Sequence, residues 1–283
     1  MKLITKEKPE KFWLSLCIVM VLTLVSCSNE TQNLTNKKVR IITLAPHLAE
    51  LVASAGALDN LVGVVSYSDF PQKVMELPHV GDAFKLDYEA ILSLSPDIIL
   101  TWRGGTPQGV IEKLKSLNLT VVETEIKELA DIAKVIEQIS VITSSQEFAH
   151  KSIQIFSQTL TQYKHQHYRP QTTFIEISPK PLYTVSSQHW MSEAVSICGF
   201  MNIYSELKQL SAPITLESLI SHNPQTILNI SKQVDNQWQQ WQTLQAVKNN
   251  RILTLSPDYL SRPTMRILTG IEKLCQFNQL SKG

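Results

Sequence analysis

Aromatic side chains stand where predicted strands end. Tyr67 follows the second predicted strand, Trp102 closes the third, and Tyr183 comes just after Pro181 in the second half of the chain. Ligands collect at the carboxyl ends of parallel strands, and one such ring can bury roughly 150–250 Å², at about 25 cal/mol per Å². Any one of these rings is at least as compatible with ordinary packing. Together they favour a cleft for a broad, flat ligand.

Polar groups accompany the rings. Asp258, Tyr259 and Arg262 follow the last predicted strand of the second half. A guanidinium group can orient a ligand through its fixed set of hydrogen-bond donors. We therefore expect Arg262 to supply polar orientation beside the rings.

Motifs of common enzyme classes are absent from the sequence. It contains no GxSxG elbow, HExxH pair or Walker pattern. Asp69 and Asp97 could be imagined as acids, but Asp97 lies between Pro96 and a buried strand, where an aspartate commonly caps a turn. We predict a binding protein and no enzyme, with an exported hydrolase as the alternative from another class.

Histidine is scarce where a ligand could lie. Of the seven histidines, His165 and His167 fall at the end of the predicted linking helix and are expected in solvent. Only His47, after the first strand, is expected near the cleft, although a role at the start of the next helix is the commoner outcome. A zinc site needs several histidines, and haem favours an axial histidine or tyrosine. The sequence therefore predicts no metal site.

Strand-like and helical patterns alternate along the chain, which indicates parallel sheets built from βαβ units. The predicted strands span 39–44, 61–65, 98–102, 119–123, 172–177, 226–230 and 251–255. The predicted helices span 48–57, 190–198 and 262–280, and two further helices begin near Asp87 and Pro107. Residues 129–168 lack Gly and Pro and predict a long helix with a break near 143–145. We expect two Rossmann-like α/β lobes with parallel sheets, joined by a single long backbone helix.

Two stretches of the chain echo each other. Residues 89–100, EAILSLSPDIIL, match residues 217–228, ESLISHNPQTIL, and each predicts a helix, a proline break and a buried strand. Glu89 and Glu217 begin the two helices, where a carboxylate suits the helix dipole. Capping alone would explain both, yet equivalent carboxylates on two lobes would also suit docking onto a two-fold partner.

The amino-terminal segment predicts export. Four lysines precede an apolar run over 12–26, which is shorter than the roughly 20 residues that span a bilayer and is typical of a signal peptide. The run ends in LVSC at Cys27, which resembles the bacterial lipobox; an uncleaved helical anchor is the alternative. Two acyl chains on Cys27 would anchor the protein stably. We expect a lipoprotein signal peptide over 1–26 and a flexible tether over 27–38, with the protein in the periplasm or at the cell surface.

The composition agrees with a globular body behind that tether. Of 283 residues, 43% are hydrophobic, and 26 basic against 25 acidic side chains leave a net charge of +1. Without a basic excess, nucleic acid is a poor candidate for the ligand. We expect an N-terminal lobe over 39–127, a linking helix over 128–169 and a C-terminal lobe over 170–283.

The four cysteines divide by position. Cys17 falls in the signal peptide and Cys27 is the lipid site, so Cys198 and Cys275 remain as a pair in an oxidising compartment. We predict a disulfide between them, and two buried thiols are the alternative. In the chain-entropy model, such a bond contributes roughly 4 kcal/mol.

Several runs carry a family resemblance. They are VRIITLAPHLAELVASAG, GVVSYSDFP, LSPDIIL and TWRGGT in the first half and FIEISPKPLYTV, SICGFMNIY and RPTMRILTGIEKLC in the second. In this order they resemble the periplasmic cobalamin (vitamin B12)-binding proteins of ABC importers, and more loosely the wider family that binds ferric siderophores and haem. The resemblance spans 39–277. It implies a class III periplasmic binding protein that captures a corrinoid between its lobes and delivers it to a permease.

The resemblance also implies roles for individual residues. These are ring contacts to the corrin at Tyr67, Trp102 and Tyr183, polar contacts at Asp258 and Arg262, a turn beside the pocket at Gly104 and Gly105, a disulfide between Cys198 and Cys275, and salt bridges to the two permease subunits at Glu89 and Glu217. Cobalamin is then a transported ligand and not a cofactor. The implied partners are the corrinoid and an inner-membrane ABC permease dimer, with the binding protein itself a monomer.

Two positions depart from the family pattern. Where the family has tryptophan, this sequence has Ala83, with Phe84 beside it, and Ser211. We expect two ring contacts to be missing; Phe84 or Trp190 could compensate, although Trp190 could equally be a core residue. A ferric siderophore or haem is the runner-up ligand, and transfer without a dedicated permease is a further alternative.

Overall fold

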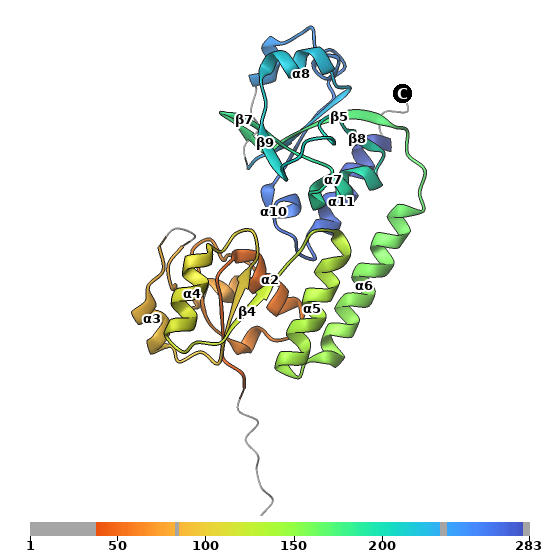
Figure 1. The fold of residues 1–283 in the computed structure, drawn as a ribbon. Coiled ribbons are helices and arrows are strands. Elements are labelled where there is room, and N and C mark those ends of the chain that lie inside the picture. Colours follow the sequence, from red (N-terminus) through yellow and green to blue (C-terminus); the bar gives the residue numbers. More distant parts are fainter. Residues whose placement is uncertain (1–37, 83–84, 233–236, 280–283) are drawn as a thin grey trace, which may run out of the picture. The chain divides into compact units, whose positions relative to one another are not determined.

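The computed structural model describes residues 38–82, 85–232 and 237–279 (Figure 1). The expected signal peptide, Cys27, nearly all of the tether, Ala83 and Phe84 lie outside these residues. From Val39 onward the chain forms one compact unit. Within the described ranges, no helix combines the length and the apolar character needed to cross a membrane.

The N-terminal lobe is built on a parallel sheet of four strands. Short apolar runs form β1 (Ile41–Thr43), β2 (Leu61–Val64), β3 (Ile98–Trp102) and β4 (Val121–Thr124), in the order β2-β1-β3-β4. The connections contain α2 (Pro46–Ser54), α3 (Tyr88–Ser93) and α4 (Gln108–Ser116), with 3-10 turns η1 (Leu58–Asn60) and η2 (Gln72–Glu76). Every residue of β1 is buried, as expected for the central strand of a parallel sheet.

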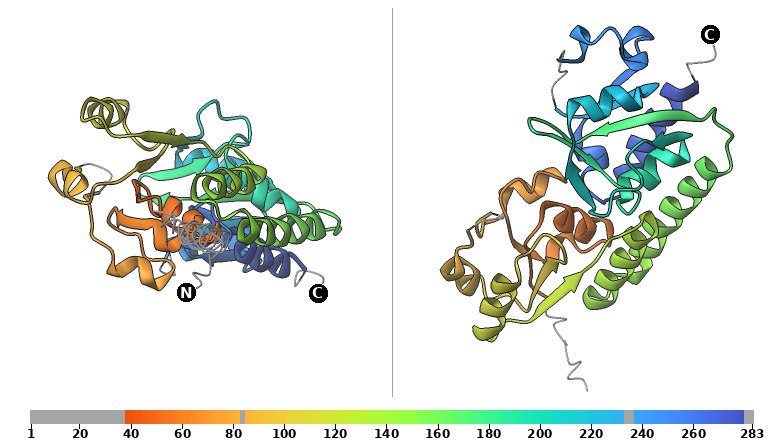
Figure 2. Two further views of the ribbon diagram at one scale, coloured as in Figure 1. Left: turned by 90° about the horizontal axis from the view of Figure 1, so that it is seen from below. Right: turned by 45° about the horizontal axis from the view of Figure 1, so that its top comes forward.

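The C-terminal lobe repeats this plan (Figure 2). Its parallel sheet contains β5 (Gln171–Glu176), β8 (Phe200–Asn202), β10 (Thr226–Ile230) and β11 (Ile252–Leu255), in the order β11-β10-β5-β8. Its helices are α7 (Trp190–Ile197), α8 (Leu216–His222), α9 (Gln245–Lys248), α10 (Pro257–Leu260) and α11 (Ile267–Gln279), with the 3-10 turn η3 (Gln237–Gln240). The predicted fold, two α/β lobes with parallel sheets, is confirmed, and β1, β2, β3 and β4 correspond to β5, β8, β10 and β11.

The echo in the sequence is a structural repeat. Asp87 and Thr215 cap α3 and α8, because their side chains accept hydrogen bonds from the backbone N–H groups of Ala90 and Ser218 at 2.9 and 3.2 Å. Near the end of each helix a residue has a positive φ, one position before the proline. The same local signals therefore place β3 and β10 at equivalent positions of the two sheets.

A small antiparallel sheet, which contacts β5, was not predicted. It consists of β6 (Ser178–Pro179), β7 (Leu182–Val185) and β9 (Ser211–Pro213), in the order β6-β7-β9. Strands of two to four residues are too short to show an alternating pattern. Tyr183 lies on the middle strand of this sheet.

Two helices fill the segment between the lobes. α5 (Leu129–Thr143) is capped by Ser144, which has a φ of 56°, and α6 (Gln146–Lys164) begins after Ser145 and runs back beside α5 (Figures 1 and 2). Ser145 supports the turn by donating its hydroxyl to the carbonyl of Ala55 at 2.6 Å. The break lies where the sequence predicts it, and α6 is the long helix that leads to β5. One apolar core includes residues of α2, α5, α7 and α11.

The C-terminal end differs in one respect from the expectation. The predicted helix over 262–280 is wrong at its start, because α11 begins only at Ile267. Pro263 explains this, since a proline disfavours helical backbone at the preceding residue. Arg262 therefore lies on a linker between α10 and α11. The sulfur atoms of Cys198 and Cys275 form a disulfide that joins the end of α7 to α11.

Candidate ligand-binding site

A cavity of about 310 Å³ lies at the carboxyl ends of β1, β2 and β3. The chain runs from β1 to β2 on one side of β1 and then crosses over to β3 on the other side, so the carboxyl ends of these strands form the switch point where ligands bind in such sheets. Leu44, Val65 and Trp102 contribute apolar lining, and Ser66 and Thr106 add polar groups. The whole lining comes from the N-terminal lobe.

Trp102 forms part of the cavity wall. Its ring packs edge-on against the ring of His47, with centroids 4.9 Å apart, and against that of Trp190 at 6.3 Å. The backbone of Gly105 lies so close that a Cβ atom there would come within 2.1 Å of Trp102 Cε3. Glycine at this position therefore lets the Trp102 ring pack against the backbone, since any larger residue would displace the ring, and Gly104, with a φ of 95°, makes the adjoining turn.

Tyr67 lies at the same cavity and is unusual in two ways. It is 80% exposed, and its φ of 67° places a non-glycine residue in the left-handed region. Its carbonyl oxygen accepts a hydrogen bond from Arg262 Nη2 at 3.1 Å. The ring of Tyr67 therefore faces solvent, while its backbone is hydrogen-bonded to the C-terminal lobe.

His47 is a buried imidazole on the cavity wall. It is 4% exposed, and its Nε2 atom is shielded from solvent and has no hydrogen-bond partner. Burial, assisted by the positive charge of Arg262, lowers the pKa of His47 to about 3. The ring is therefore neutral at every physiological pH. The expectation that His47 lies beside the candidate site is confirmed.

Arg262 reaches from the C-terminal lobe to acids of the N-terminal lobe. It donates to Glu50 Oε1 at 3.1 Å and to the carboxylate of Asp69, and its Nε lies 3.6 Å from Asp258 Oδ1. Burial raises the pKa of Asp69, but the hydrogen bond and charge of Arg262 outweigh it and lower that pKa. Burial likewise lowers the pKa of Arg262, and the bonds to Asp69 and Glu50 reverse the effect. Much of the hydrogen-bonding capacity of this guanidinium is therefore already used by acceptors within the protein.

The other predicted contacts of the C-terminal lobe do not line this cavity. Asp258 accepts a hydrogen bond from Ser256 Oγ at 3.0 Å. The ring centroid of Tyr259 lies 5.9 Å from Lys273 Nζ, and Tyr183 lies on β7. The structure thus brings Tyr67, Trp102 and Gly105 together at the cavity. Arg262 is connected to this group through its hydrogen bond to the Tyr67 carbonyl and its ion pairs with Glu50 and Asp69.

Two residues bear on the positions where the family has tryptophan: Trp190, which could compensate for a missing ring, and Ser211, which replaces one of the tryptophans. Neither of them lines the cavity. Trp190 is 6% exposed and donates its indole N–H to the carbonyl of Leu260 at 2.9 Å. It is a core residue that supports the ring of Trp102. Ser211 is exposed on β9.

The two glutamates considered for docking occupy equivalent positions. Glu89 and Glu217 lie in the first turns of α3 and α8, and both are exposed. Their backbone sites are related by the internal repeat described above. They are therefore available to a partner on both lobes.

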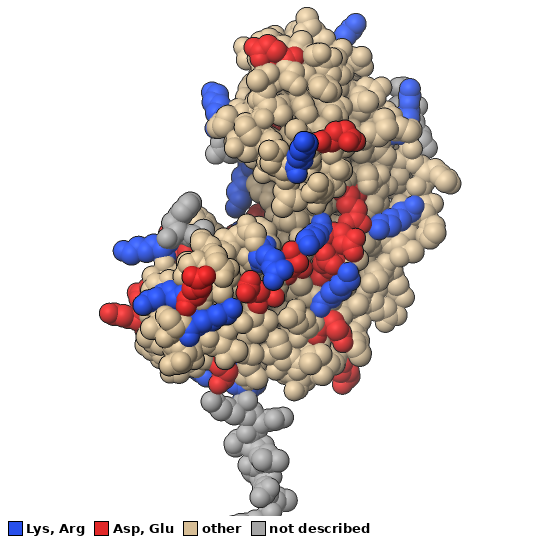
Figure 3. Space-filling model, viewed as in Figure 1, with Lys and Arg blue, Asp and Glu red and all other residues tan. Residues whose placement is uncertain are grey.

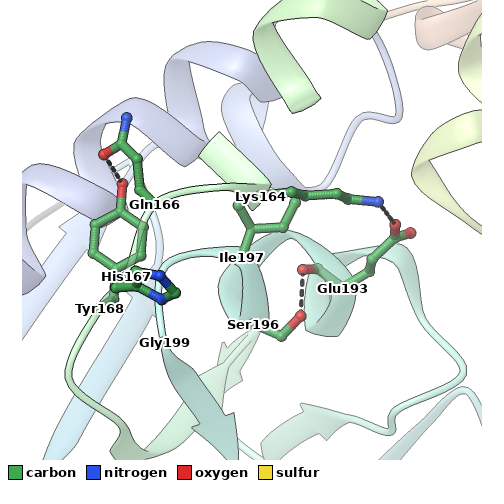
Figure 4. A pocket seen from close by; sticks show the side chains of 8 residues that line it. All are labelled: Lys164, Gln166, His167, Tyr168, Glu193, Ser196, Ile197 and Gly199. Carbon is green, nitrogen blue, oxygen red and sulfur yellow. Dashed lines mark hydrogen bonds and ion pairs between the residues drawn. The ribbon is translucent and has the colours of Figure 1, made fainter. Parts of the chain in front are cut away.

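A second cavity, of about 420 Å³, lies between the end of α6 and α7 (Figure 4). Lys164 Nζ lies 3.2 Å from Glu193 Oε1, and Glu193 Oε2 accepts a hydrogen bond from the backbone N–H of Leu129 at 2.7 Å. The hydroxyl of Tyr168 donates to Gln166 Oε1 at 2.6 Å. Its lysine and glutamate already pair with each other, so we regard this region as a brace between α5, α6 and α7.

Charges of both signs are interspersed over the face seen in Figure 3. This agrees with the near balance of 26 basic and 25 acidic residues. In the part of the chain that the structure describes, no group of three or more His, Cys, Asp and Glu side chains is arranged to hold a metal ion.

Comparison with known proteins identifies the family. A family model for periplasmic binding proteins matches residues 41–259. The chain is also 34% identical over 248 residues to the vitamin B12-binding protein of Vibrio cholerae serotype O1, covering 86% of this chain and 90% of that protein. The chain belongs to the periplasmic binding protein family.

Solved structures of periplasmic binding proteins share its fold. The periplasmic vitamin B12 binding protein BtuF of Vibrio cholerae matches with a TM-score of 0.81 at 34% identity, over 87% of this chain and 99% of that one. The periplasmic heme binding protein HutB of Vibrio cholerae matches with a TM-score of 0.73 over 87% and 99% of the two chains, at 19% identity. The second likeness concerns the fold alone. The two-lobed fold is that of the class III periplasmic binding proteins.

Two residues that join the lobes of this periplasmic binding protein, Glu50 and Arg266, were not predicted from the sequence. Glu50 and Arg266 form a bidentate ion pair, with contacts at 2.9 and 2.5 Å across 216 positions of sequence. A carboxylate among the apolar residues of α2 is a usable signal, because a buried charge needs a partner. The spacing of Arg262 and Arg266 by four residues suggests a paired role but not its target. Asp69, imagined as an acid, proves to be a partner of Arg262.

Proposed function

We propose that this protein binds cobalamin or a related corrinoid and delivers it to an ABC permease of the inner membrane. The observation that carries the proposal is the switch-point cavity walled by Trp102 and Tyr67. It is supported by the 34% identity, over most of both chains, to a protein named for vitamin B12 binding. The ligand is captured and released without the making or breaking of a bond.

The cavity suits one part of a broad, flat ligand. Its volume of about 310 Å³ is at the small end of ligand sites, which span roughly 300–1,000 Å³. The remainder of a corrin would lie against the exposed ring of Tyr67. Removal of these ring surfaces from water would supply most of the affinity. The apolar core shared by α2, α5, α7 and α11 would limit the lobes to a small hinge movement.

Parallel titrations test the ligand. We expect cyanocobalamin to bind one molecule per chain in calorimetry, to colour the purified protein, and to be recovered unchanged by mass spectrometry. Haem and a panel of ferric siderophores are the comparison ligands. Saturable binding of haem or a siderophore without binding of cyanocobalamin, or turnover of any ligand, would contradict the proposal.

Haem is the second candidate, and His47 is the observation that favours it. A neutral imidazole on a cavity wall is a suitable axial ligand for haem iron. The shielded Nε2 atom would have to move before it could bind iron, which is why we prefer the corrinoid. If haem is the ligand, His47→Ala should abolish the shift of the Soret band that haem shows on binding.

Glu89 and Glu217 are proposed to dock the loaded protein onto the two permease subunits. The support is their exposure at equivalent positions of the two lobes. Glu89→Arg with Glu217→Arg should leave cyanocobalamin affinity intact and abolish cellular uptake. Glu112→Arg with Glu206→Arg makes the same charge change at exposed positions of the two lobes and should leave uptake normal. Normal uptake by the first pair would refute this role.

Cys27 is proposed to carry a lipid that holds a monomeric protein on a membrane. Cys27→Ser should move the protein from the membrane fraction to the soluble fraction, whereas Cys17→Ser should not. Mass spectrometry of the mature amino-terminal peptide should show the diacylglyceryl group, and light scattering of the detergent-free Cys27→Ser protein should show a monomer. A soluble wild-type protein would contradict the lipid anchor.

A further inference from the structure

Two arginines of the C-terminal lobe share one buried carboxylate of the N-terminal lobe. Glu50, on α2, is 3% exposed and accepts hydrogen bonds from Arg266 Nε at 2.9 Å, Arg266 Nη2 at 2.5 Å and Arg262 Nη1 at 3.1 Å. A carboxylate removed from water is costly unless cations and hydrogen bonds compensate it. Glu50 therefore connects both guanidinium groups to α2.

Both arginines continue to the loop that carries Tyr67. Arg262 donates from Nη2 to the carbonyl of Tyr67 at 3.1 Å and pairs with Asp69. The guanidinium carbon of Arg266 lies 4.5 Å from the ring centroid of Phe70. Three of four consecutive loop residues are therefore held from the opposite lobe. The arginine cluster, as we call it, consists of Glu50, Asp69, Arg262 and Arg266.

The arginine cluster is suited to holding this loop. The two guanidinium groups face the carboxylates of Glu50 and Asp69, and Asp258 lies close to Arg262 as well, so the cluster carries no excess positive charge that would attract an anion. Both terminal nitrogens of Arg262 already donate to protein oxygens, and its side chain is only 16% exposed. Little of this guanidinium remains for a direct bond to a ligand.

Tyr67 is the residue that needs such a hold. A non-glycine residue with positive φ persists only where its surroundings hold it in place, and Tyr67 has a φ of 67° with an 80% exposed side chain. The bond from Arg262 to its carbonyl is a hold of this kind.

We propose that Glu50 and Arg266 are positioning residues for ligand binding. They orient Arg262, and Arg262 holds the backbone of Tyr67 so that its ring faces the ligand. This rests on the proposed function, because Tyr67 serves a ligand only if the neighbouring cavity receives one. Glu50 and Arg266 themselves need not touch the ligand.

The first test requires no ligand. In the full chain, Glu50→Gln keeps the size of the side chain but removes its charge, and Arg262→Met removes the bonds to the loop. We expect both variants to speed amide hydrogen exchange in peptides that cover 66–71 by about tenfold or more. Glu193→Gln alters a carboxylate that braces α5, α6 and α7, and it should leave this segment unchanged. Unchanged exchange at 66–71 in Glu50→Gln would overturn the proposal.

The second test is a double-mutant cycle on cyanocobalamin affinity, with urea unfolding as a separate measurement of stability. We expect Glu50→Gln to weaken binding about tenfold and to have no further effect in an Arg262→Met or a Tyr67→Ala background, because it acts through those residues. Glu193→Gln should leave affinity unchanged. Equal losses from Glu50→Gln in every background would reveal a general structural effect and overturn the proposal.

The two measurements separate the failure of this inference from failure of the proposed function. A wild-type protein that does not bind cyanocobalamin contradicts the function, while the exchange result still decides whether the cluster holds the loop. Arg266→Lys and Arg266→Met provide a second route in case Glu50→Gln does not fold. Lysine keeps the charge but loses the bidentate contact, so its effect on exchange and affinity should lie between wild type and Arg266→Met. No effect of either variant would also overturn the proposal.

Discussion

The two lobes share a strand order but differ at their strand ends. In the N-terminal lobe, Trp102 closes β3 and Leu44 follows β1, and both line the cavity. From the pairing registers of the two sheets, Ile230 of the C-terminal lobe is equivalent to Trp102, and Glu176 is equivalent to Leu44. There Glu176 is 1% exposed and accepts a hydrogen bond from the indole of Trp238 at 2.7 Å.

This difference shows that a repeated fold need not provide two equal binding surfaces. The C-terminal lobe covers its strand end with its own tryptophan, whereas the N-terminal lobe leaves a cavity there. The C-terminal lobe instead sends Arg262 and Arg266 across to the rim of that cavity. We infer that one lobe receives the ligand and the other holds the loop that contacts it.

The largest effect is expected from Glu176→Leu. Leucine would remove the carboxylate that accepts from the indole N–H of Trp238 and from the side-chain amide of Gln237, and a hydrogen bond to a charged group contributes about 1.5–3 kcal/mol. Urea unfolding should show a loss of about 3 kcal/mol, while calorimetry on the folded variant should show unchanged cyanocobalamin affinity. A tenfold loss of affinity would place this strand end in the site and break the comparison.

Trp102→Ala should act on binding instead. Loss of an aromatic anchor should weaken cyanocobalamin binding by about 10- to 100-fold, which corresponds to roughly 1.4–2.7 kcal/mol. Trp241→Ala is the control, because it removes a partly buried tryptophan that packs in the C-terminal lobe. Equal affinities for Trp102→Ala and wild type in calorimetry would exclude the cavity as the ligand site.

The buried His47 and the half-buried His189, one in each lobe, predict a pH dependence of stability. Burial lowers the pKa of His47 to about 3, with help from Arg262, and burial lowers that of His189 to about 4, against about 6.5 when unfolded. Between about pH 4 and 6.5 the unfolded state binds protons that the folded state does not, so stability falls as pH falls, by up to about 1.4 kcal/mol per pH unit for each histidine.

Variants assign this dependence to the two lobes. His47→Gln and His189→Gln should each remove about one histidine's share of the slope when urea unfolding is measured at pH 7, 6 and 5. His189→Gln should also lower stability at pH 7, because His189 Nδ1 accepts the backbone N–H of Met191 at the start of α7. A slope that neither variant changes would mean that other groups control the acid response.

The smallest effect tests the part of the lobes that is alike. Asp87→Ala and Thr215→Ala each remove an N-cap from an equivalent helix, and each should lower the free energy of unfolding by about 1 kcal/mol. Thermal or urea unfolding can measure both. Strongly unequal losses would show that the repeat is only approximate at these two helices.

By itself the sequence determined the local elements and the family. The bounds of β3 and β10 and the break before α6 followed from apolar runs and from the prolines near the strands, whereas the residues that cap α3 and α8 proved to be Asp87 and Thr215 and not the glutamates that follow them. These signals are readable because each acts over only a few neighbouring residues.

Only the tertiary structure decided which of the site residues meet. It joined Arg262 to Asp69 across 193 positions of sequence and made Trp190 a support for Trp102. It also left Tyr183 on a small sheet that no periodicity predicted. Such contacts depend on how whole lobes pack and on which buried charges must find partners, and no local spacing of residues specifies either.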